Sequence, residues 1–190
     1  MEFRAINWSR DGAAIRSLDT SFTTDRVYSL RQADLSFSLV EEMRTPAVTK
    51  RYEVAITEES IAASLATIAA HEGDVLHGFA SVKKEPWNRR AIITDFYLDP
   101  RSRRLGFGRN MMKETFARVV EASVRVLWVE TQNVNLPAVN FYRSMGFDIC
   151  GFDSRLYDEP LDAEVALYLS KSLPNPEPFL ALEPTISAHL

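Results

Sequence analysis

The chain has 190 residues, of which 46% are hydrophobic and 25% are charged, and its formal net charge is -4 at pH 7. This length and balance fit one globular domain with a single apolar core, and they exclude a chain that is disordered throughout. The net negative charge also argues against a general nucleic-acid binder, because such proteins carry an excess of Lys and Arg that replaces phosphate counterions.

The first third of the chain predicts five elements. In chain order they are a strand at 3–6, a helix at 11–18, a hairpin of two strands at 27–30 and 37–40, and a helix at 58–70. Ala14, Ile15 and Leu18 recur at helical spacing and support the first helix. The polar residues 21–25 break that pattern before the hairpin. Apolar residues at spacings of four and three favour the second helix, although residues 61–65 also suit a buried strand.

Strands and helices alternate along the rest of the predicted domain. They are antiparallel strands at 76–82 and 91–98, a helix at 109–120, a strand at 124–130, a helix that begins within 133–137 and ends at Gly146, and strands at 147–152 and 165–169. The helix between 91–98 and 124–130 predicts that these two strands are parallel, because a helical crossover restores the strand direction. We expect one domain at 1–170 and a proline-punctuated tail at 171–190.

The cysteine, the histidines and the apolar runs limit which cellular compartment and which cofactors can be expected. Cys150 is the only cysteine, so no intrachain disulfide is expected. The three histidines are scattered without zinc-site spacing, which predicts that the protein holds no metal. The amino-terminus lacks the pattern of a secretory signal, and no apolar run approaches the roughly 20 residues that span a bilayer. The sequence therefore predicts a cytoplasmic protein without a membrane segment.

A basic loop with two alternate glycines separates the strand at 91–98 from the helix at 109–120. Its sequence is Arg101-Ser102-Arg103-Arg104-Leu105-Gly106-Phe107-Gly108-Arg109. The glycines allow successive backbone N–H groups to converge on one anion, and a helix N-terminus adds partial positive charge. A Walker loop is excluded because no Gly-Lys-Ser/Thr follows, and Met111 replaces the third glycine of the dinucleotide fingerprint. Phosphate is the expected guest, and a tight turn with solvated arginines is the alternative.

A second pattern comes after the strand at 124–130. It reads Asn135-x-x-Ala138-x-x-Phe141-Tyr142-x-x-x-Gly146-Phe147. Its helix begins beside the carboxyl ends of two neighbouring parallel strands, where open α/β sheets bind ligands. This placement favours a functional Tyr142 over a tyrosine that only packs in the core.

Together the two patterns resemble the GNAT superfamily of acetyl-CoA-dependent N-acetyltransferases, through residues 103–108 and 135–147. The specific motifs span residues 75–155. A closer resemblance is to the streptothricin acetyltransferases, and it is carried by residues 18–25, 49–52, 130–138 and 151–157. The resemblance implies an α/β GNAT fold, with a mixed and largely antiparallel sheet, a central splayed parallel pair and flanking helices.

The resemblance also implies a co-substrate and an acceptor. Acetyl-CoA would donate its acetyl group to a primary amine, which in streptothricins is the β-lysine amine. Loop N–H groups would bind the pyrophosphate with help from nearby arginine side chains, and backbone at 96–98 would pair with the pantetheine amides. The expected cofactor-binding residues are Phe96, Tyr97, Leu98, Arg103, Arg104, Leu105, Gly106, Phe107, Gly108, Arg109, Asn135 and Tyr142.

Catalysis needs a base, because amines are mostly protonated at neutral pH. Asp95 and Glu130 are the candidates, since both lie near the ends of adjacent predicted strands, although such carboxylates also hold loops. The family pattern places Tyr142 as the acid that protonates the departing thiolate. Four aromatic residues could line an amine pocket by cation–π contact or pack in the core, and we keep Tyr157 as the substrate-binding candidate. The other three are Phe22, Tyr28 and Trp87.

Three alternatives stay open on the sequence alone. The acceptor is predicted to be a small cationic amine of the streptothricin type, and a polyamine, an aminoglycoside-like compound or a protein amine is the runner-up. A non-catalytic acyl-CoA sensor needs only the anion-binding loop. Asn135 binds the pantetheine arm or caps its helix, and one side chain can do both. A homodimer is a family-level expectation, and no nucleic-acid or membrane partner is expected.

Overall fold

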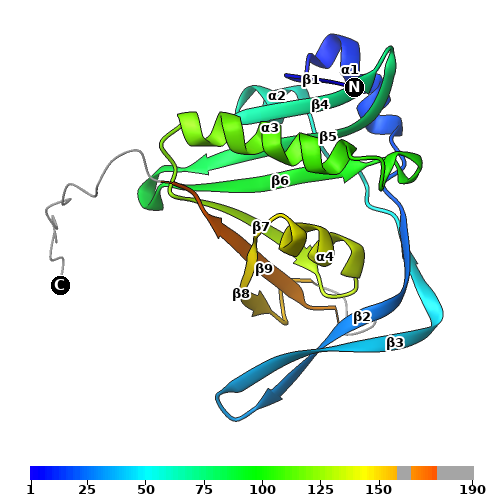
Figure 1. The fold of residues 1–190 in the computed structure, drawn as a ribbon, viewed down its shortest axis with the longest axis vertical. Coiled ribbons are helices and arrows are strands. Elements are labelled where there is room, and N and C mark those ends of the chain that lie inside the picture. Colours follow the sequence, from blue (N-terminus) through cyan, green and yellow to red (C-terminus); the bar gives the residue numbers. More distant parts are fainter. Residues whose placement is uncertain (158–163, 175–190) are drawn as a thin grey trace, which may run out of the picture.

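A seven-stranded mixed sheet forms the centre of the computed structural model, which describes residues 1–157 and 164–174 (Figure 1). Its strand order is β1-β4-β5-β6-β7-β9-β8. The strands are β1 (Glu2–Arg4), β4 (Ala66–Glu72), β5 (Val75–Glu85), β6 (Arg90–Leu98), β7 (Val126–Gln132), β8 (Asp148–Asp153) and β9 (Ala166–Ser172). Only β6 and β7 pair in parallel, and the other neighbours are antiparallel. The predicted mixed sheet with a central parallel pair is confirmed.

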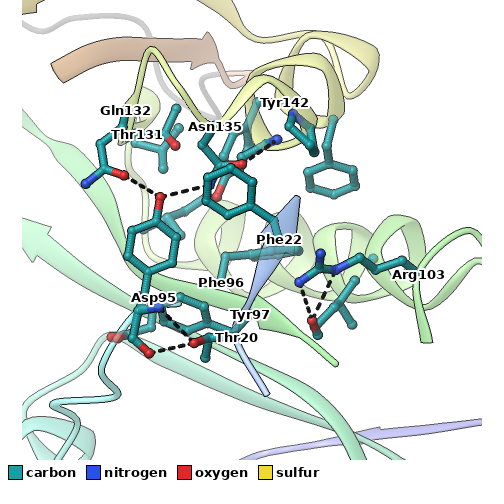
Figure 2. A pocket seen from close by; sticks show the side chains of 18 of the residues that line it. Thr20, Phe22, Asp95, Phe96, Tyr97, Arg103, Thr131, Gln132, Asn135 and Tyr142 are labelled. Atoms are coloured by element: carbon teal, nitrogen blue, oxygen red, sulfur yellow. Dashed lines mark hydrogen bonds between the residues drawn. The ribbon is translucent and has the colours of Figure 1, made fainter. Parts of the chain in front are cut away.

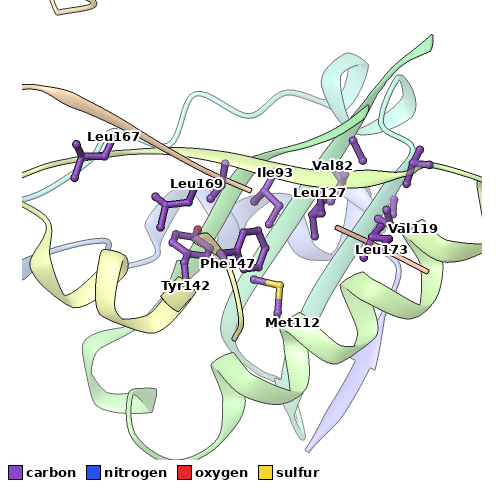
Figure 3. Packing of buried hydrophobic residues seen from close by; sticks show 14 of the residues in the cluster. Val82, Ile93, Met112, Val119, Leu127, Tyr142, Phe147, Leu167, Leu169 and Leu173 are labelled. Atoms are coloured by element: carbon purple, nitrogen blue, oxygen red, sulfur yellow. The ribbon is translucent and has the colours of Figure 1, made fainter. Parts of the chain in front are cut away.

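Helices cover both faces of this sheet. They are α1 (Trp8–Ser17), α2 (Glu58–Ala62), α3 (Phe107–Glu121) and α4 (Leu136–Ser144), and short 3-10 turns come after β5 and β6 as η1 (Pro86–Asn88) and η2 (Pro100–Ser102). The largest apolar cluster packs α3 and α4 against the centre of the sheet, with Met112, Tyr142 and Phe147 among its buried side chains (Figure 3). On the opposite face, Ile15 of α1 packs with Ala69 and Phe79.

The predicted helix at 58–70 is wrong beyond its first turn. Helix α2 ends at Ala62, and β4 begins at Ala66. Both faces of β4 are covered, since Ile68 belongs to the cluster around α3 and Ala69 to the cluster around α1. A strand buried on both faces has a continuous apolar sequence, which periodicity alone cannot distinguish from a buried helix.

A separate two-stranded hairpin, β2 (Phe22–Ala33) and β3 (Ser36–Lys50), extends beside the sheet (Figure 1). The hairpin is confirmed, but it is longer than predicted, because the expected break at 21–25 lies mostly inside β2. A register irregularity between Thr24 and Arg26 absorbs these polar residues, and the Thr24 hydroxyl bonds the Arg26 backbone there. At the end of β3, Lys50 Nζ lies 2.6 Å from Glu164 Oε1, and this ion pair attaches the hairpin to the segment before β9.

The last strand is longer than the predicted strand at 165–169. Strand β9 continues to Ser172, and Leu173 is buried in the central cluster. The helix predicted after 133–137 is confirmed as α4, with Asn135 as its N-cap and Gly146 in the left-handed region at φ 83°. The predicted loop at 158–162 and the tail from 175 onwards lie outside the described residues.

Asn133 joins three parts of the chain before α4. It is buried, its side-chain amide donates to the Tyr28 carbonyl at 2.7 Å, and its side-chain oxygen accepts from the Val165 N–H at 2.8 Å. Backbone hydrogen bonds with the same two residues complete the junction. The hairpin, the end of β7 and the start of β9 are therefore fixed by one side chain.

Replacing this side chain should destabilise the fold. Asn133→Ala leaves the Val165 N–H and the Tyr28 carbonyl without their side-chain partner. Each buried group left unpaired lowers the free energy of unfolding by about 1–3 kcal/mol. We expect a lower urea midpoint for Asn133→Ala, whereas the exposed Asn140→Ala should stay within about 0.5 kcal/mol of the wild type. Equal midpoints for both variants would contradict the role of Asn133.

Candidate functional site

An opening between β6 and β7 creates the site. The two strands pair only from Arg90↔Val126 to Ile93↔Val129. Beyond this point β6 stays paired with β5 as far as Leu98, and β7 stays paired with β9 as far as Gln132. A register irregularity where β5 faces Thr94 accompanies the divergence. The carboxyl ends of the parallel pair are therefore splayed, as the family resemblance implied.

A cleft of about 1130 Å³ occupies this opening (Figure 2). Most of the residues predicted from the sequence line it: Asp95, Phe96, Tyr97, Leu98, Arg103, Arg104, Gly106, Gly108, Arg109, Glu130, Asn135, Tyr142 and Tyr157. The lining also includes residues that the prediction left out, among them Thr20, Phe22, Tyr52, Thr131 and Gln132. Tyr52 and Gln132 lie within segments that carry the closer family resemblance, so a signal for them was present.

The cleft has two sides, because successive side chains of a strand point to opposite faces. Phe96 faces α4, with its ring centroid 5.3 Å from Phe141 and 6.1 Å from Tyr142. Tyr97 faces the opposite way, 6.1 Å from Tyr52. Asp95 shares the face of Tyr97 by this alternation. The splayed strands thus connect a helix-covered face to an aromatic and acidic face.

The loop before α3 has the form of an anion cradle. Arg104 and Gly106 adopt left-handed backbone conformations, at φ 63° and 89°. No side chain caps the N-terminus of α3, and the hydrogen bonds of the described chain begin its ladder at the N–H of Asn110. Arg104 and Arg109 are exposed at the cleft rim. Backbone N–H groups at a helix N-terminus beside two arginines suit a diphosphate.

Two loop residues predicted to bind the cofactor lie outside the cleft lining, and a third, Gly108, has a packing role as well. Leu105 is 63% exposed and does not line the cleft, and Phe107 is buried with its ring 4.3 Å from that of His77. A Cβ at Gly108 would lie 2.9 Å from Leu98 Cδ1 and 3.3 Å from Phe141 Cε2. The missing side chain at Gly108 therefore serves the packing of α3 against β6 and α4.

Arg103 departs from the predicted pattern most clearly. Its guanidinium donates to the carbonyl of Leu98 at 3.1 and 3.3 Å (Figure 2). It also donates to the carbonyl of Ser21 at 2.6 Å. Burial lowers the pKa of this group. The Leu98 carbonyl is thus already engaged, which leaves the backbone of Phe96 and Tyr97 as the open edge of β6.

Tyr142, predicted from the family resemblance to be the proton donor, lines the cleft. Its side chain is buried between the rings of Phe96, Phe141 and Phe147. Burial, with a smaller contribution from Tyr97 and nearby carboxylates, raises the pKa of its hydroxyl above the ordinary value. The hydroxyl therefore stays protonated at neutral pH and can donate a proton.

The two candidate bases have different surroundings. Glu130 is half-buried and accepts a hydrogen bond from the Tyr157 hydroxyl, and burial raises the pKa of its carboxyl against the effect of that bond. Asp95 accepts hydrogen bonds from Ser81 at 2.6 Å and Thr94 at 3.0 Å. A raised pKa brings Glu130 closer to the pH at which a base works best. The Glu130 carboxylate is the better base on this ground.

Asn135 has a structural role in the site. Its side-chain oxygen accepts from the Ala138 N–H at 3.2 Å as the cap of α4, and its amide donates to the Tyr52 hydroxyl at 3.1 Å. Tyr52 in turn donates to Gln132. The predicted cap is confirmed, and Asn135 also lines the cleft, so binding of the pantetheine arm stays a prediction.

The remaining aromatic candidates separate clearly. Phe22 and Tyr157 line the cleft, whereas Tyr28 does not, and Trp87 is 81% exposed on η1. The Tyr52 ring stacks on the Phe22 ring, with the two centroids 5.9 Å apart. Burial of the Tyr97 hydroxyl raises its pKa to about 12. These rings form an apolar wall with protonated hydroxyls on the acidic side of the cleft.

The described chain shows neither a metal-binding cluster nor a membrane-spanning helix. Across residues 1–157 and 164–174, no group of three or more His, Cys, Asp or Glu side chains is placed to bind a metal ion. Within the same ranges, no helix combines the length and the apolar character that crossing a membrane requires.

Comparison with known proteins places this geometry in a family. Residues 25–147 match the model of the acetyltransferase (GNAT) family. A streptothricin acetyltransferase of Streptomyces lavendulae is 36% identical over 183 residues, which cover 91% of this chain and 95% of the relative.

Two solved structures share nearly the whole fold. The nourseothricin acetyltransferase structure is 35% identical with a TM-score of 0.81, and the match covers 91% of this chain and 98% of that one. A Bacillus anthracis str. Ames protein assigned as a streptothricin acetyltransferase, in complex with acetyl coenzyme A, is 26% identical with a TM-score of 0.79. That match covers 90% of this chain and 99% of the other.

The half-buried Glu130 carboxylate should make stability depend on pH. Because the pKa of Glu130 is raised in the folded state, its contribution to stability is present at low pH and is lost as the pH rises through the folded value. Glu130→Gln has no carboxyl that ionises, so it removes this loss of stability, and its amide oxygen still accepts the hydrogen bond from Tyr157. We expect its urea midpoint to exceed that of the wild type at pH 8, by an amount that shrinks towards pH 4. The exposed Glu121→Gln is the control, and a gain independent of pH would contradict the burial of a charged Glu130.

Proposed function

Because the chain belongs to the GNAT family of acetyltransferases, we propose that it transfers the acetyl group of acetyl-CoA to the β-lysine amine of a streptothricin-type antibiotic. The transfer is direct, within a ternary complex. The observation that carries the proposal is a single cleft, which joins the anion cradle before α3 to a carboxylate-bearing face through the gap between β6 and β7. Acetylation would neutralise a positive charge of the antibiotic and so confer resistance.

The cofactor side of the cleft is formed by the cradle and by the open edge of β6. Free N–H groups at the start of α3 bind the diphosphate, and Arg104 and Arg109 add charge. The backbone of Phe96 and Tyr97 pairs with the pantetheine amides as an added strand would. The acetyl coenzyme A complex of the Bacillus anthracis relative supports this choice of co-substrate.

The acceptor side is the aromatic and acidic face. Glu130 and Asp95 lie at the ends of the two splayed strands and attract a cationic amine. Tyr157, which donates to Glu130, and the wall of Phe22, Tyr52 and Tyr97 enclose it. Placing the amine here brings it to the opening through which the thioester is reached.

The chemistry assigns one proton transfer to each side. Bound acetyl-CoA supplies the thioester carbonyl that the amine attacks. Glu130 takes a proton from the substrate ammonium, which frees the lone pair of the amine nitrogen. This nitrogen forms a bond to the carbonyl carbon while the C–S bond breaks. Tyr142 donates its hydroxyl proton to the departing thiolate. The second ammonium proton leaves with the formation of the amide and is lost to solvent or returned to Tyr142.

A substrate panel tests the function. Release of CoA is measured with streptothricins, polyamines, aminoglycosides and peptides, and acetyl-CoA binding is measured separately by calorimetry. We expect turnover to be highest with streptothricin, and the product mass to show one added acetyl group on the β-lysine moiety. Turnover of another amine class alone would overturn the acceptor, and binding without turnover of any amine would point to a sensor.

Removing the hydroxyl of Tyr142 tests the proton donor. Tyr142→Phe keeps the ring packing against Phe96 and Phe147, and we expect kcat to fall roughly 10²–10⁴-fold while the Kd of acetyl-CoA changes little. Phe141→Leu on the same helix is a packing control that leaves the hydroxyl in place. A Tyr142→Phe enzyme with unchanged kcat would contradict the role.

Two glycines with the same backbone strain test the cradle. Gly106 and Gly73 are both left-handed, and no atom lies within 4 Å of a Cβ at either position. Alanine at either should therefore cost about 1–2 kcal/mol of stability. Only Gly106→Ala is expected to weaken acetyl-CoA binding, because Gly73 lies in the turn between β4 and β5. Equal acetyl-CoA affinities, measured by calorimetry, would contradict a cradle formed by the loop backbone.

The sequence-based expectations of a cytoplasmic location, a homodimer and a domain boundary at residue 170 stay predictions. So does the absence of a metal, a nucleic-acid partner or a membrane partner. A small-molecule acceptor is consistent with the named activities of the relatives.

A further inference from the structure

The guanidinium of Arg103 connects two segments that are distant in the sequence. It lies on the loop before α3, and its donors reach the carbonyl of Leu98 at the end of β6 and the carbonyl of Ser21 before β2. The residue is half-buried. No ion pair links Arg103 to a carboxylate within the described chain, so its hydrogen bonds to main-chain carbonyls account for its position.

The segment that receives this contact has no helix or strand of its own. Residues 18–21 connect α1 to β2. In the described structure, hydrogen bonds from other segments reach residues 19–21 at two points. The Thr20 hydroxyl donates to the Tyr52 carbonyl at 2.5 Å and accepts from the Tyr52 N–H at 3.0 Å. Arg103 donates to the Ser21 carbonyl. Besides the burial of Leu18 and Thr20, this segment is therefore held by few hydrogen bonds from the rest of the described chain.

The wall on the acceptor side begins directly after this segment. Phe22 is the next residue after Ser21 and stacks on Tyr52, whose ring makes a tilted contact with that of Tyr97. The Tyr52 hydroxyl is held by Asn135 and Gln132 at the ends of the opposite elements. A continuous set of contacts thus runs from the loop of the anion cradle, through Arg103 and Ser21, to the rings that face the acceptor.

The chemistry of the side chain suits this connection. A guanidinium has five N–H donors in a planar fork and can hold two carbonyls at once, whereas a lysine ammonium is a compact point charge. Arg103 comes after η2 and directly precedes the left-handed Arg104. An anion that fixes the N–H groups of this loop also fixes the backbone from which the Arg103 side chain extends.

On these contacts we propose that Arg103 is a positioning residue, which couples occupation of the diphosphate cradle to the order of the acceptor wall at Ser21 and Phe22. The proposal rests on the proposed function for the nature of the two ligands. Bound CoA holds Arg103 on the Ser21 carbonyl and thereby strengthens acceptor binding, and a bound acceptor strengthens CoA binding by the same factor. Arg103 is accordingly not a ligand of the diphosphate.

Kinetics separate a positioning residue from a phosphate ligand. Arg103→Met keeps the apolar stem and removes the donors, and Arg103→Lys keeps the charge. We expect Arg103→Met to raise the streptothricin KM at least tenfold and to change the acetyl-CoA Kd less than threefold, with Arg103→Lys between it and the wild type. Arg101→Met is the matched control, because Arg101 is 88% exposed on the same loop and, within residues 1–157 and 164–174, pairs only with Asp99, so both constants should stay unchanged. An acetyl-CoA Kd that rises as much as the acceptor KM would overturn the proposal.

Amide exchange tests the coupling without any acceptor. Hydrogen–deuterium exchange is measured with and without CoA for the folded wild type, Arg103→Met and Arg103→Lys. CoA should slow exchange in both the cradle and the segment around residues 18–24 of the wild type, but only in the cradle of Arg103→Met. The same protection of 18–24 in Arg103→Met would overturn the coupling. If Arg103→Met does not fold, Arg103→Lys decides the result, with reduced protection of 18–24 supporting the coupling and wild-type protection overturning it. A wild type that shows the exchange pattern but acetylates no streptothricin would refute the proposed function alone.

Discussion

The early end of pairing between β6 and β7 is the constraint on which the site depends. Each strand keeps its outer neighbour, so the opening does not expose two unsupported edges to solvent. The strand ends therefore diverge while their side chains stay fixed in register. Both the backbone edge at Phe96 and Tyr97 and the carboxylates Asp95 and Glu130 derive their positions from this single break in the ladder.

The break also separates opposite electrostatic environments. On the helix-covered side, the N-terminus of α3 and two exposed arginines favour an anion. On the other side, the half-buried carboxylates of Glu130 and Asp95 favour a cation. An anionic carrier and a cationic acceptor can thus reach one reacting centre from two faces of the sheet. Tyr142, whose hydroxyl pKa burial raises further above its ordinary value, lies on the side where a thiolate would leave.

The acceptor wall comes from parts of the chain remote from the phosphate loop. Phe22 begins the hairpin and Tyr52 comes just after it. Tyr52 is held by hydrogen bonds with Thr20 and Asn135 that span long stretches of sequence, and Phe22 stacks on it. The hairpin itself is fixed by Asn133 and by the pair of Lys50 with Glu164. Within one fold family, the loop of the cradle can therefore stay constant while the wall adapts to a different amine.

The sequence by itself determined the features that depend on local chain geometry. Gly146 predicted the left-handed end of α4, Asn135 and Pro137 predicted its start, and the crossover predicted a parallel pair, because each depends on backbone conformations of neighbouring residues. Only the tertiary structure decided that residues 66–70 form a strand, since their burial depends on helices covering both faces. It likewise decided that Arg103 bonds carbonyls, that Gly108 serves packing, and that Tyr52 joins the cleft. These outcomes rest on contacts between residues far apart in the chain, which local patterns do not encode.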